Sequence, residues 1–497
     1  MMLDIAARRA DLSPDSKAVW ADGRWHTYRQ MNERAEALAG ALAASGVQRG
    51  DRVGIIAHNH IAHFDLMLAT AKLGFIHTPL NYRLSAPEQE QIGRLVEPRL
   101  LLHDEAHASL ARSAATPSTS LKPLEEYSDW LDAAPAAPDV REPDAMDTQM
   151  ILFTGGTTGT PKGAELPYRQ AFYNATGTIV SWGITSRDCA IQATPCFHAA
   201  VNALSMPLYY AGGRIVLQST FDPAGYLQLV TDHGASILFL VPTMFGMLAR
   251  APGFLDADMS SVQWAISGGA PCPDSTRGAF AARGVRFRQG YGLTEAGVNC
   301  FSIPPEVAEA KPQSVGKPIL HGRAALRDPD NGGPVQTGAT GELILSGPHV
   351  FTGYFRQPEA TADVLDGGWL RTGDLARQDE DGDWYLVGRR KEMYVSGGEN
   401  VYPAEVENHI ASHPGVAECA VTAISDTQWG EVGLAVIVPA TPPDDFDALA
   451  ADIRAFLAGR LARYKLPKQI AFADSLPRSG AGKILKDELA RLAREKS

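Results

Sequence analysis

The first hundred residues alternate between short apolar runs and longer amphipathic segments. The segment from Thr27 to Gly46 has apolar residues at helical spacing and ends in a glycine suited to a helix C-terminus. Apolar runs follow at 52–58 and 75–80, with a second helical pattern at 64–73 between them. Strands that alternate with helices form βαβ units with parallel, buried strands. The alternation therefore predicts an α/β fold of mostly parallel sheets packed with helices.

The length of the chain adds a second constraint. A chain of 497 residues exceeds what one hydrophobic core can hold, so at least two domains are expected. The pattern changes after Gly388, and a small α+β domain is predicted beyond it. The predicted helices and strands of this domain cover 403–413, 416–424, 434–438 and 446–464. We expect an N-terminal domain over 1–388, a hinge over 389–391 and a C-terminal lid domain over 392–497.

Composition narrows the class of protein. The net charge of -12 argues against a nucleic-acid surface. The five cysteines are odd in number and form no C-x-x-C pair, so reduced thiols are expected in place of disulfides or a zinc site. No segment is apolar enough to span a membrane and the N-terminus lacks a leader pattern, which predicts a cytoplasmic protein. Residues 113–147, rich in Ala, Pro, Ser and acidic residues, are expected to form a surface connection.

A glycine- and threonine-rich segment follows the apolar run at 150–153. Glycines let a backbone turn tightly around a polyanion, threonine hydroxyls donate to phosphate oxygens, and a lysine adds a positive charge. The segment therefore predicts a phosphate-binding loop, with an ordinary surface loop as the alternative. Its candidate nucleotide-binding residues are Thr154, Gly155, Gly156, Thr157, Thr158, Gly159 and Lys162.

This segment is not a Walker A loop. That motif needs Gly-Lys followed directly by Ser or Thr. Here Pro161 separates Gly159 from Lys162, and Gly163 occupies the hydroxyl position.

The segment resembles the characteristic loop of the adenylate-forming superfamily, which groups acyl-CoA synthetases, peptide-synthetase adenylation domains and luciferases. Gly155 stands where the family usually has serine. Further motifs follow in the family's order along nearly the whole chain. They are Tyr291-Gly-Leu-Thr-Glu295, Arg371-Thr-Gly-Asp374, Gly388 to Lys391, Gly397 to Pro403 and Pro477 to Lys483.

The resemblance implies roles at the nucleotide. Tyr291 would lie against adenine, Thr294 would contact the α-phosphate and Glu295 would hold Mg²⁺, an ion that prefers carboxylate and phosphate oxygens. Asp374 would bind the ribose hydroxyls, with Arg389 assisting there or at phosphate. Each also has a structural alternative, a core aromatic for Tyr291 or a helix-terminal charge for Glu295. Further nucleotide-contacting residues are Gly269, Ala270, Gly290 and Gly292.

The same resemblance implies a moving C-terminal lobe. Lys483 would be the principal catalytic cation, because charge builds on the α-phosphate as the acid attacks it. Lys391 matches the family's hinge position. Gly397 and Gly398 would line the pantetheine tunnel, where glycine leaves backbone room. A solvated surface lysine is the alternative reading of both lysines.

His198 matches an aromatic or histidine position where the family's acid site meets its thiol tunnel. Two interpretations of His198 remain open: it positions the substrate carboxylate, or it is a core histidine whose hydrogen bonds are satisfied. Neutral residues near the expected pocket, Val201, Gly290, Gly297 and Val298, suggest an apolar acyl or aryl tail.

Taken together, the resemblance implies an ATP-dependent acid–CoA ligase that uses Mg²⁺ and coenzyme A and forms an acyl-AMP from a fatty or aromatic acid. One alternative is a ligase that loads a carrier protein, and another is a non-catalytic nucleotide-binding protein. The expected partners are the acid, ATP and CoA, with no nucleic acid and no membrane span. A homodimer is a common default for such enzymes.

Overall fold

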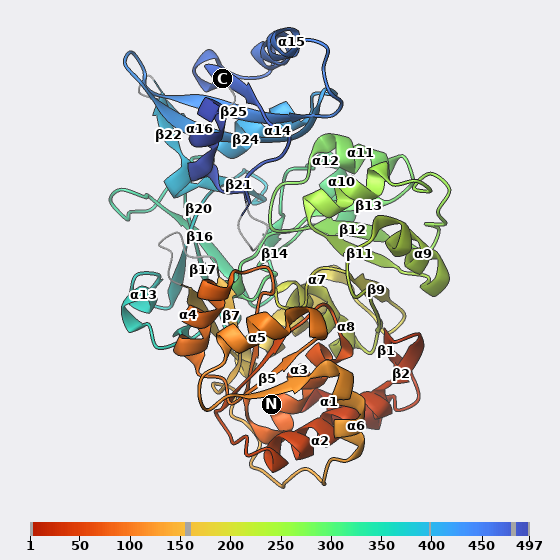
Figure 1. The fold of residues 1–497 in the computed structure, drawn as a ribbon. Coiled ribbons are helices and arrows are strands. Elements are labelled where there is room, and N and C mark those ends of the chain that lie inside the picture. The colour runs from red at the N-terminus through yellow and green to blue at the C-terminus, as the bar shows by residue number, and fades with distance from the viewer. Residues whose placement is uncertain (1–2, 155–160, 397–398, 479–483, 496–497) are drawn as a thin grey trace.

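The computed structural model describes residues 3–154, 161–396, 399–478 and 484–495 (Figure 1). Two seven-stranded sheets of mostly parallel strands form the N-terminal part of this described chain. In spatial order, the first contains β18 (Gly353–Tyr354), β8 (Lys162–Pro167), β7 (Thr148–Thr154), β4 (Ile76–Pro79), β3 (Arg52–Ile56), β5 (Leu100–His103) and β6 (Ser120–Pro123). The second contains β13 (Arg286–Gln289), β12 (Trp264–Ser267), β11 (Ile237–Leu240), β9 (Cys189–Gln192), β10 (Arg214–Leu217), β1 (Lys17–Ala21) and β2 (Arg24–Thr27).

Helices pack around these sheets (Figure 1). The longer ones are α1 (Ile5–Leu12), α2 (Tyr28–Ala44), α3 (Ile61–Leu73), α4 (Ala86–Val96), α7 (Tyr168–Trp182), α9 (Pro223–His233), α10 (Pro242–Arg250) and α11 (Asp274–Ala281). Shorter ones are α5 (Ala108–Ala114), α6 (Tyr127–Asp132), α8 (Met206–Ala211), α12 (Pro305–Ala310), α13 (Pro358–Ala362), η1 (Glu105–His107), η2 (Leu124–Glu126), η3 (Val201–Ser205) and η4 (Thr294–Ala296). The predicted α/β class is confirmed.

Local sequence explains where the first of these elements begin and end. The Thr27 side chain caps α2 by accepting a hydrogen bond from the Gln30 backbone amide. The side-chain oxygen of Gln30 in turn accepts a hydrogen bond from the Thr27 backbone amide. Gly46 follows this helix with φ +81°, a conformation that costs glycine little. α3 is buried along almost its whole length, which fits a helix enclosed between sheets.

Two local predictions were wrong in part. The segment 113–147 is not a plain connection, because β6, η2 and α6 lie within it. β6 extends the parallel sheet by pairing with β5, so a strand stands where turn-forming residues suggested none. The predicted helix over 446–464 ends at Ala458, followed by Gly459 as its C-cap and by η6 (Arg463–Lys465). Glycine is a common residue at helix ends and explains the early stop.

An antiparallel sheet extends the N-terminal part toward the C-terminal domain. Its strands are β16 (Arg323–Arg327), β17 (Gly341–Ser346), β20 (Trp369–Gln378), β19 (Leu365–Asp366) and β21 (Trp384–Arg389). The two-stranded pair β14 (Phe301–Ser302) and β15 (Lys317–Pro318) lies apart from it. β20 and β21 form a hairpin that carries both Asp374 and Arg389, which are cross-strand partners.

The turn of this hairpin holds a compact ion cluster, here called the Lys311 cluster. The Lys311 ammonium lies 2.8 Å from Asp379, 2.7 Å from Asp381 and 2.7 Å from Asp383. Asp379 also accepts a hydrogen bond from the Tyr385 hydroxyl at 3.0 Å. The cluster ties the chain after α12 to the β20–β21 turn.

The C-terminal domain is a five-stranded sheet with helices at one end of the molecule (Figure 1). Its strands are β23 (Glu399–Val401), β22 (Tyr394–Ser396), β25 (Gly430–Pro439), β24 (Val416–Asp426) and β26 (Gln469–Phe472). Its helices are α14 (Pro403–Ala411), α15 (Phe446–Ala458) and α16 (Lys486–Glu495), and η5 (Arg390–Glu392) precedes it. Its core is separate from the N-terminal cores and contains Val406, Val421, Ile437 and Ile453. This agrees with the predicted α+β class.

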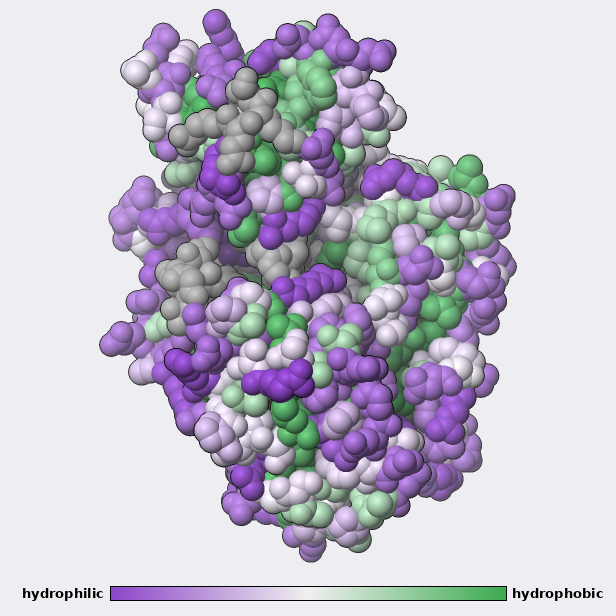
Figure 2. All heavy atoms as spheres, viewed as in Figure 1, coloured by the Kyte–Doolittle hydropathy of each residue, from purple (hydrophilic) through white to green (hydrophobic). Residues whose placement is uncertain are grey.

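Hydrophilic residues cover most of the face seen in Figure 2. Across the described residues, every helix is too short or too polar to cross a bilayer.

Candidate active site

The turn after β13 is held in a tight conformation. The Gly290 amide donates to the Ser267 carbonyl at 2.7 Å, which ties the turn to the end of β12. A Cβ on Gly292 would lie 1.7 Å from the Val298 carbonyl oxygen, so only glycine fits there. Val298 itself has φ +64°, a strained backbone for a β-branched residue. Such strain clusters at functional sites.

Glu295 lies in η4 of this turn and is buried at 9% exposure. Its carboxylate accepts a hydrogen bond of 2.8 Å from the Tyr354 hydroxyl, and its backbone carbonyl accepts from the Phe351 amide at 2.8 Å. Burial, followed by the Glu295 charge, raises the pKa of Tyr354, so the hydroxyl stays protonated and donates. The partner of the Glu295 side chain among the described residues is thus a neutral hydroxyl. The negative charge of Glu295 is therefore available to a cation.

The ends of the predicted phosphate loop lie beside Glu295. Thr154 and Lys162 are antiparallel partners at the ends of β7 and β8. The Lys162 ammonium lies 5.2 Å from the centre of the Tyr354 ring, within cation–π range. Tyr354 thus contacts both Lys162 and Glu295, and a divalent cation bound to a polyphosphate in this loop fits the donor set. The intervening Gly155, Gly156, Thr157, Thr158 and Gly159 lie outside the described residues.

Asp374 contacts both Tyr291 and Arg389. Its carboxylate accepts a 2.6 Å hydrogen bond from the Tyr291 hydroxyl and forms an ion pair with Arg389 Nε, also at 2.6 Å. Asp374 is 6% exposed, whereas the Arg389 side chain is 42% exposed. Burial, with Asp374 next to it, raises the pKa of Tyr291 well above its usual value, so Tyr291 remains a donor. The structure therefore brings Tyr291, Asp374 and Arg389 together.

The segment 267–271 lies beside the same turn. Gly269 has φ +84°, which glycine tolerates, and both Gly269 and Ala270 are exposed. The Gln289 amide donates to the Ala270 carbonyl at 3.0 Å. Backbone groups of Gly269 and Ala270 are thus presented next to Gly290.

His198 lies on the loop that precedes η3. Its ring packs on Phe197 with centroids 4.4 Å apart, and Phe197 packs on Tyr82 at 5.0 Å. Burial, followed by the nearby Arg83 charge, lowers the pKa of His198 to about 4, so its imidazole is neutral at pH 7. A neutral imidazole can accept one hydrogen bond and donate another without adding charge.

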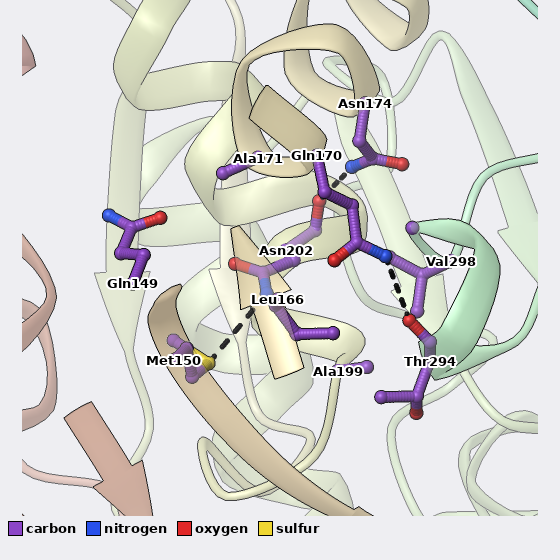
Figure 3. A pocket seen from close by; sticks show the side chains of 11 residues that line it. Gln149, Met150, Leu166, Gln170, Ala171, Asn174, Ala199, Asn202, Thr294 and Val298 are labelled. Carbon is purple, nitrogen blue, oxygen red and sulfur yellow. Dashed lines mark hydrogen bonds between the residues drawn. The ribbon is translucent and has the colours of Figure 1, made fainter. Parts of the chain in front are cut away.

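A narrow pocket lies behind the turn (Figure 3). β7, β8, α7, η3 and η4 contribute to its wall. The lining residues are Gln149, Met150, Leu166, Gln170, Ala171, Asn174, Ala199, Asn202, Thr294, Gly297 and Val298. Of the residues predicted near the acid tail, Gly297 and Val298 line this pocket, whereas Val201 and Gly290 do not.

Several predicted residues are not described by the structure. Lys483, Gly397 and Gly398 lie outside the described residues. Lys391 lies in η5 between the two domains, and its side chain is exposed.

Sequence reasoning missed Tyr354 as a contact of Glu295 and Gln170 as a buried residue of the pocket wall. Tyr354 bonds Glu295 from β18, a two-residue strand far along the chain. Its surroundings in the sequence do not distinguish it from a core tyrosine. Gln170 stands in the first turn of a helix, where a polar residue is unremarkable, and only packing reveals it to be buried.

Comparison with known proteins agrees with this geometry. The family model described as AMP-binding enzyme matches residues 6–355, and that described as AMP-binding enzyme C-terminal domain matches 405–483. The chain is 39% identical to a feruloyl-CoA synthase of Amycolatopsis sp, over 97% of each chain. It is 33% identical to long-chain-fatty-acid–CoA ligase FadD13 of Mycobacterium tuberculosis, over 93% of this chain and 92% of that one.

A solved structure extends the likeness to the whole fold. The o-succinylbenzoate CoA synthetase MenE of Bacillus subtilis, in complex with its acyl-adenylate intermediate, superimposes with a TM-score of 0.87. The two are 28% identical, and the match covers 98% of this chain and 97% of that one. Another structure of MenE is in complex with ATP and magnesium ion.

The chain belongs to the AMP-binding enzyme family, the adenylate-forming superfamily to which its motifs point. Within that family it is an AMP-forming acid–CoA ligase, which converts a carboxylic acid to its CoA thioester through an acyl-AMP intermediate.

Proposed function

We propose that Tyr291, Thr294, Glu295, Asp374 and Lys483 divide the work of adenylation among them. The main support is Glu295, a buried carboxylate bonded to a neutral hydroxyl and lying beside both ends of the glycine- and threonine-rich loop. Glu295 would hold Mg²⁺, which when bound neutralises phosphate charge. Asp374 would exchange its bond to exposed Arg389 for bonds to the ribose hydroxyls.

In the first reaction, a carboxylate oxygen of the acid forms a bond to the α-phosphorus of ATP, and the bond to the leaving pyrophosphate oxygen breaks. Lys483 would stabilise the charge on the α-phosphoryl oxygens, with Thr294 donating a hydrogen bond. In the second, the sulfur of CoA bonds to the acyl carbon, AMP leaves, and the thiol proton is released. A neutral His198 at the acid site would position the carboxylate without repelling the thiol.

We propose that the C-terminal domain turns about Lys391 between the two reactions. The segment around η5 joins two separate hydrophobic cores, as a hinge between residues 1–388 and 392–497 requires. Gly397 and Gly398 would then face the pantetheine arm of CoA.

The acid is proposed to be compact and aromatic. The feruloyl-CoA synthase relative supports this choice, and the FadD13 relative supports a fatty acid as the alternative. A pyrophosphate-release screen over aromatic, short-chain and long-chain acids decides between them, and a preference for long chains would contradict our choice.

Two further proposals concern the cellular location and the oligomeric state of the enzyme. Because ATP and CoA are its co-substrates and the five cysteines are free, we place it in the cytoplasm. A homodimer is proposed as the default assembly, to be tested by light scattering.

The division of labour is tested with Lys483→Ala. Pyrophosphate release should fall about 10²–10³-fold, the usual cost of removing one transition-state donor. Thioester formation from a supplied acyl-adenylate should be largely retained. Lys468→Ala, which changes an exposed lysine of the same domain, serves as the matched control. Equal loss of both reactions in Lys483→Ala would contradict the proposal.

A further inference from the structure

Two histidines and an aspartate meet where two parallel strands of the first sheet end. β3 ends at Ile56 and is followed by His58, while β5 ends at His103 and is followed by Asp104 and His107. The two strands are parallel neighbours, so the segments that follow them leave the sheet side by side. One possible ligand atom from each of the three side chains lies within 4.8 Å of the others. In open α/β sheets, ligands bind at the carboxyl ends of the strands.

The Asp104 carboxylate lies at the centre of this group, here called the His58 cluster (His58, Asp104 and His107). Its Oδ2 lies 3.3 Å from His58 Nδ1, and its Oδ1 lies 2.6 Å from His107 Nδ1. The same two oxygens accept hydrogen bonds from the backbone amides of His58 and His107, both at 3.0 Å. Hydrogen bonds of this kind orient the ligands of a metal ion. The carboxylate is thus held between the two imidazoles.

Tyr82 packs against both imidazole rings of the cluster. Its ring centre lies 5.0 Å from that of His58 and 4.7 Å from that of His107, and the two imidazole centres are 4.7 Å apart. Ligand side chains that packing already holds need little reordering to bind an ion. The His107 side chain is 11% exposed and that of His58 is 36% exposed, so an ion can reach the cluster from solvent beside His58.

The spacing of the donor atoms is close to that of a tetrahedral metal site. Bonds of about 2.0–2.1 Å from a tetrahedral ion to nitrogen and oxygen place the ligand atoms roughly 3.3 Å apart. His58 Nδ1 and Asp104 Oδ2 already have this separation. The 2.6 Å contact between His107 Nδ1 and Asp104 Oδ1 is a hydrogen bond, and an ion that replaces its proton needs the two atoms to separate by less than about 1 Å. The imidazole of His107 then carries its hydrogen on Nε2.

We propose that His58, Asp104 and His107 bind a divalent transition-metal ion such as Zn²⁺. Two imidazoles and one carboxylate suit zinc, cobalt or nickel, whereas Mg²⁺ prefers oxygen ligands alone. Three protein ligands leave a further coordination position to water. The proposed ligands include no cysteine, so this site differs from the thiol-based zinc site that the cysteine pattern argued against. It also differs in its donors from the oxygen ligands proposed to hold Mg²⁺ at Glu295.

Binding is measured by isothermal titration calorimetry with Zn²⁺ on the full chain. The protein is first freed of metal with a chelator and is then kept without Mg²⁺ and ATP, so the result does not depend on the proposed reaction. One Zn²⁺ per chain should bind and should raise the melting temperature, because an ion that binds only the folded state stabilises it. Mg²⁺ at the same concentration should do neither. X-ray absorption of the zinc-loaded protein should show nitrogen and oxygen neighbours.

Two variants remove one imidazole each. His58→Asn and His107→Asn keep a polar amide close to the position of Nδ1. Each should lower the affinity for Zn²⁺ by more than about 10–10²-fold, which is the usual cost of losing only an outer partner of a metal ligand. His409→Asn changes a half-buried histidine of α14 in the C-terminal domain and should leave the affinity unchanged, as the matched control. Circular dichroism of each metal-free variant identifies any that fails to fold, and the two variants give independent readings.

Three outcomes would overturn the inference. Equal Zn²⁺ affinity in the wild type, His58→Asn and His107→Asn would assign the ion to an adventitious site elsewhere on the chain. A folded wild type that bound no Zn²⁺ would leave the cluster as a hydrogen-bonded anchor between two loops. Sulfur neighbours in the absorption spectrum, or equal affinities for Mg²⁺ and Zn²⁺, would contradict the ligand set.

Discussion

Two groups of carboxylates, one at the turn of the β20–β21 hairpin and one at the candidate active site, have different kinds of partner. In the Lys311 cluster, the ammonium lies within 2.8 Å of all three aspartates. At the candidate active site, Glu295 bonds a neutral tyrosine, and Asp374 bonds a tyrosine and a half-exposed arginine. A carboxylate with a permanent cation inside its own cluster stabilises the fold. A carboxylate with neutral or displaceable partners can bind a ligand.

The largest effect is expected from Glu295→Gln. The amide keeps the shape and can still accept from Tyr354, but the charge that would hold Mg²⁺ is gone. We expect kcat/KM for ATP to fall about 10²–10³-fold, with a higher Mg²⁺ concentration needed for half-maximal rate and an unchanged melting temperature. Pyrophosphate release across a magnesium titration measures it. A variant as active as the wild type would break the comparison by making Glu295 structural.

Asp374→Asn should have the next largest effect. Hydrogen bonds to a charged group contribute more than neutral ones, so kcat/KM for ATP should fall about 10–10²-fold, mainly through KM. Isothermal titration calorimetry with AMP should show a loss of binding affinity of the same size. If affinity were retained and only thermal stability fell, Asp374 would belong with the Lys311 cluster.

Lys311→Met should lower thermal stability and leave activity nearly unchanged, unlike the two active-site variants. Three aspartates would repel one another without their cation, so the thermal midpoint should drop, while kcat/KM below that midpoint stays within about twofold of the wild type. Thermal melting and a steady-state assay at one temperature measure the two quantities. An activity loss approaching that of Asp374→Asn would show that the hairpin turn controls the site.

The smallest expected effect is the pH dependence of the difference in stability between the wild type and Lys311→Met. Partial desolvation opposes ionisation of Asp379, but hydrogen bonds led by Lys311 lower its pKa to about 2. A folded pKa below the unfolded value of about 3.9 means that the contribution is complete above that value and is lost as pH falls through about 2. The denaturation midpoints of wild type and Lys311→Met should therefore differ equally from pH 8 to about 4 and converge below. Convergence already at pH 6 would contradict this assignment.

Sequence patterns predicted much of the fold because the relevant forces are local. Thr27 and Gln30 cap α2 within four residues, and Gly46 follows the end of that helix in the conformation that glycine favours. β6 was missed because its apolar pattern is short and its stability comes from pairing with β5. Nothing within a few residues of β6 records that partner.

The same distinction holds for the candidate site. Tyr291, Glu295 and Asp374 belong to contiguous motifs, so the sequence alone pointed to them. Tyr354 contacts Glu295 only because β18 packs beside η4 in three dimensions. No local sequence pattern contains that contact.

Arg389 closes β21 and leads directly into η5, so its bond to Asp374 joins the candidate nucleotide site to the first residues of the lobe that we propose to move. A ribose that replaced Arg389 at Asp374, as proposed, would also release the end of the strand that leads to this lobe. If nucleotide binding changes the preferred angle of the lobe, then by thermodynamic reciprocity a restraint on that angle changes the affinity for nucleotide. A crosslink between the domains would thus alter AMP binding without touching the pocket.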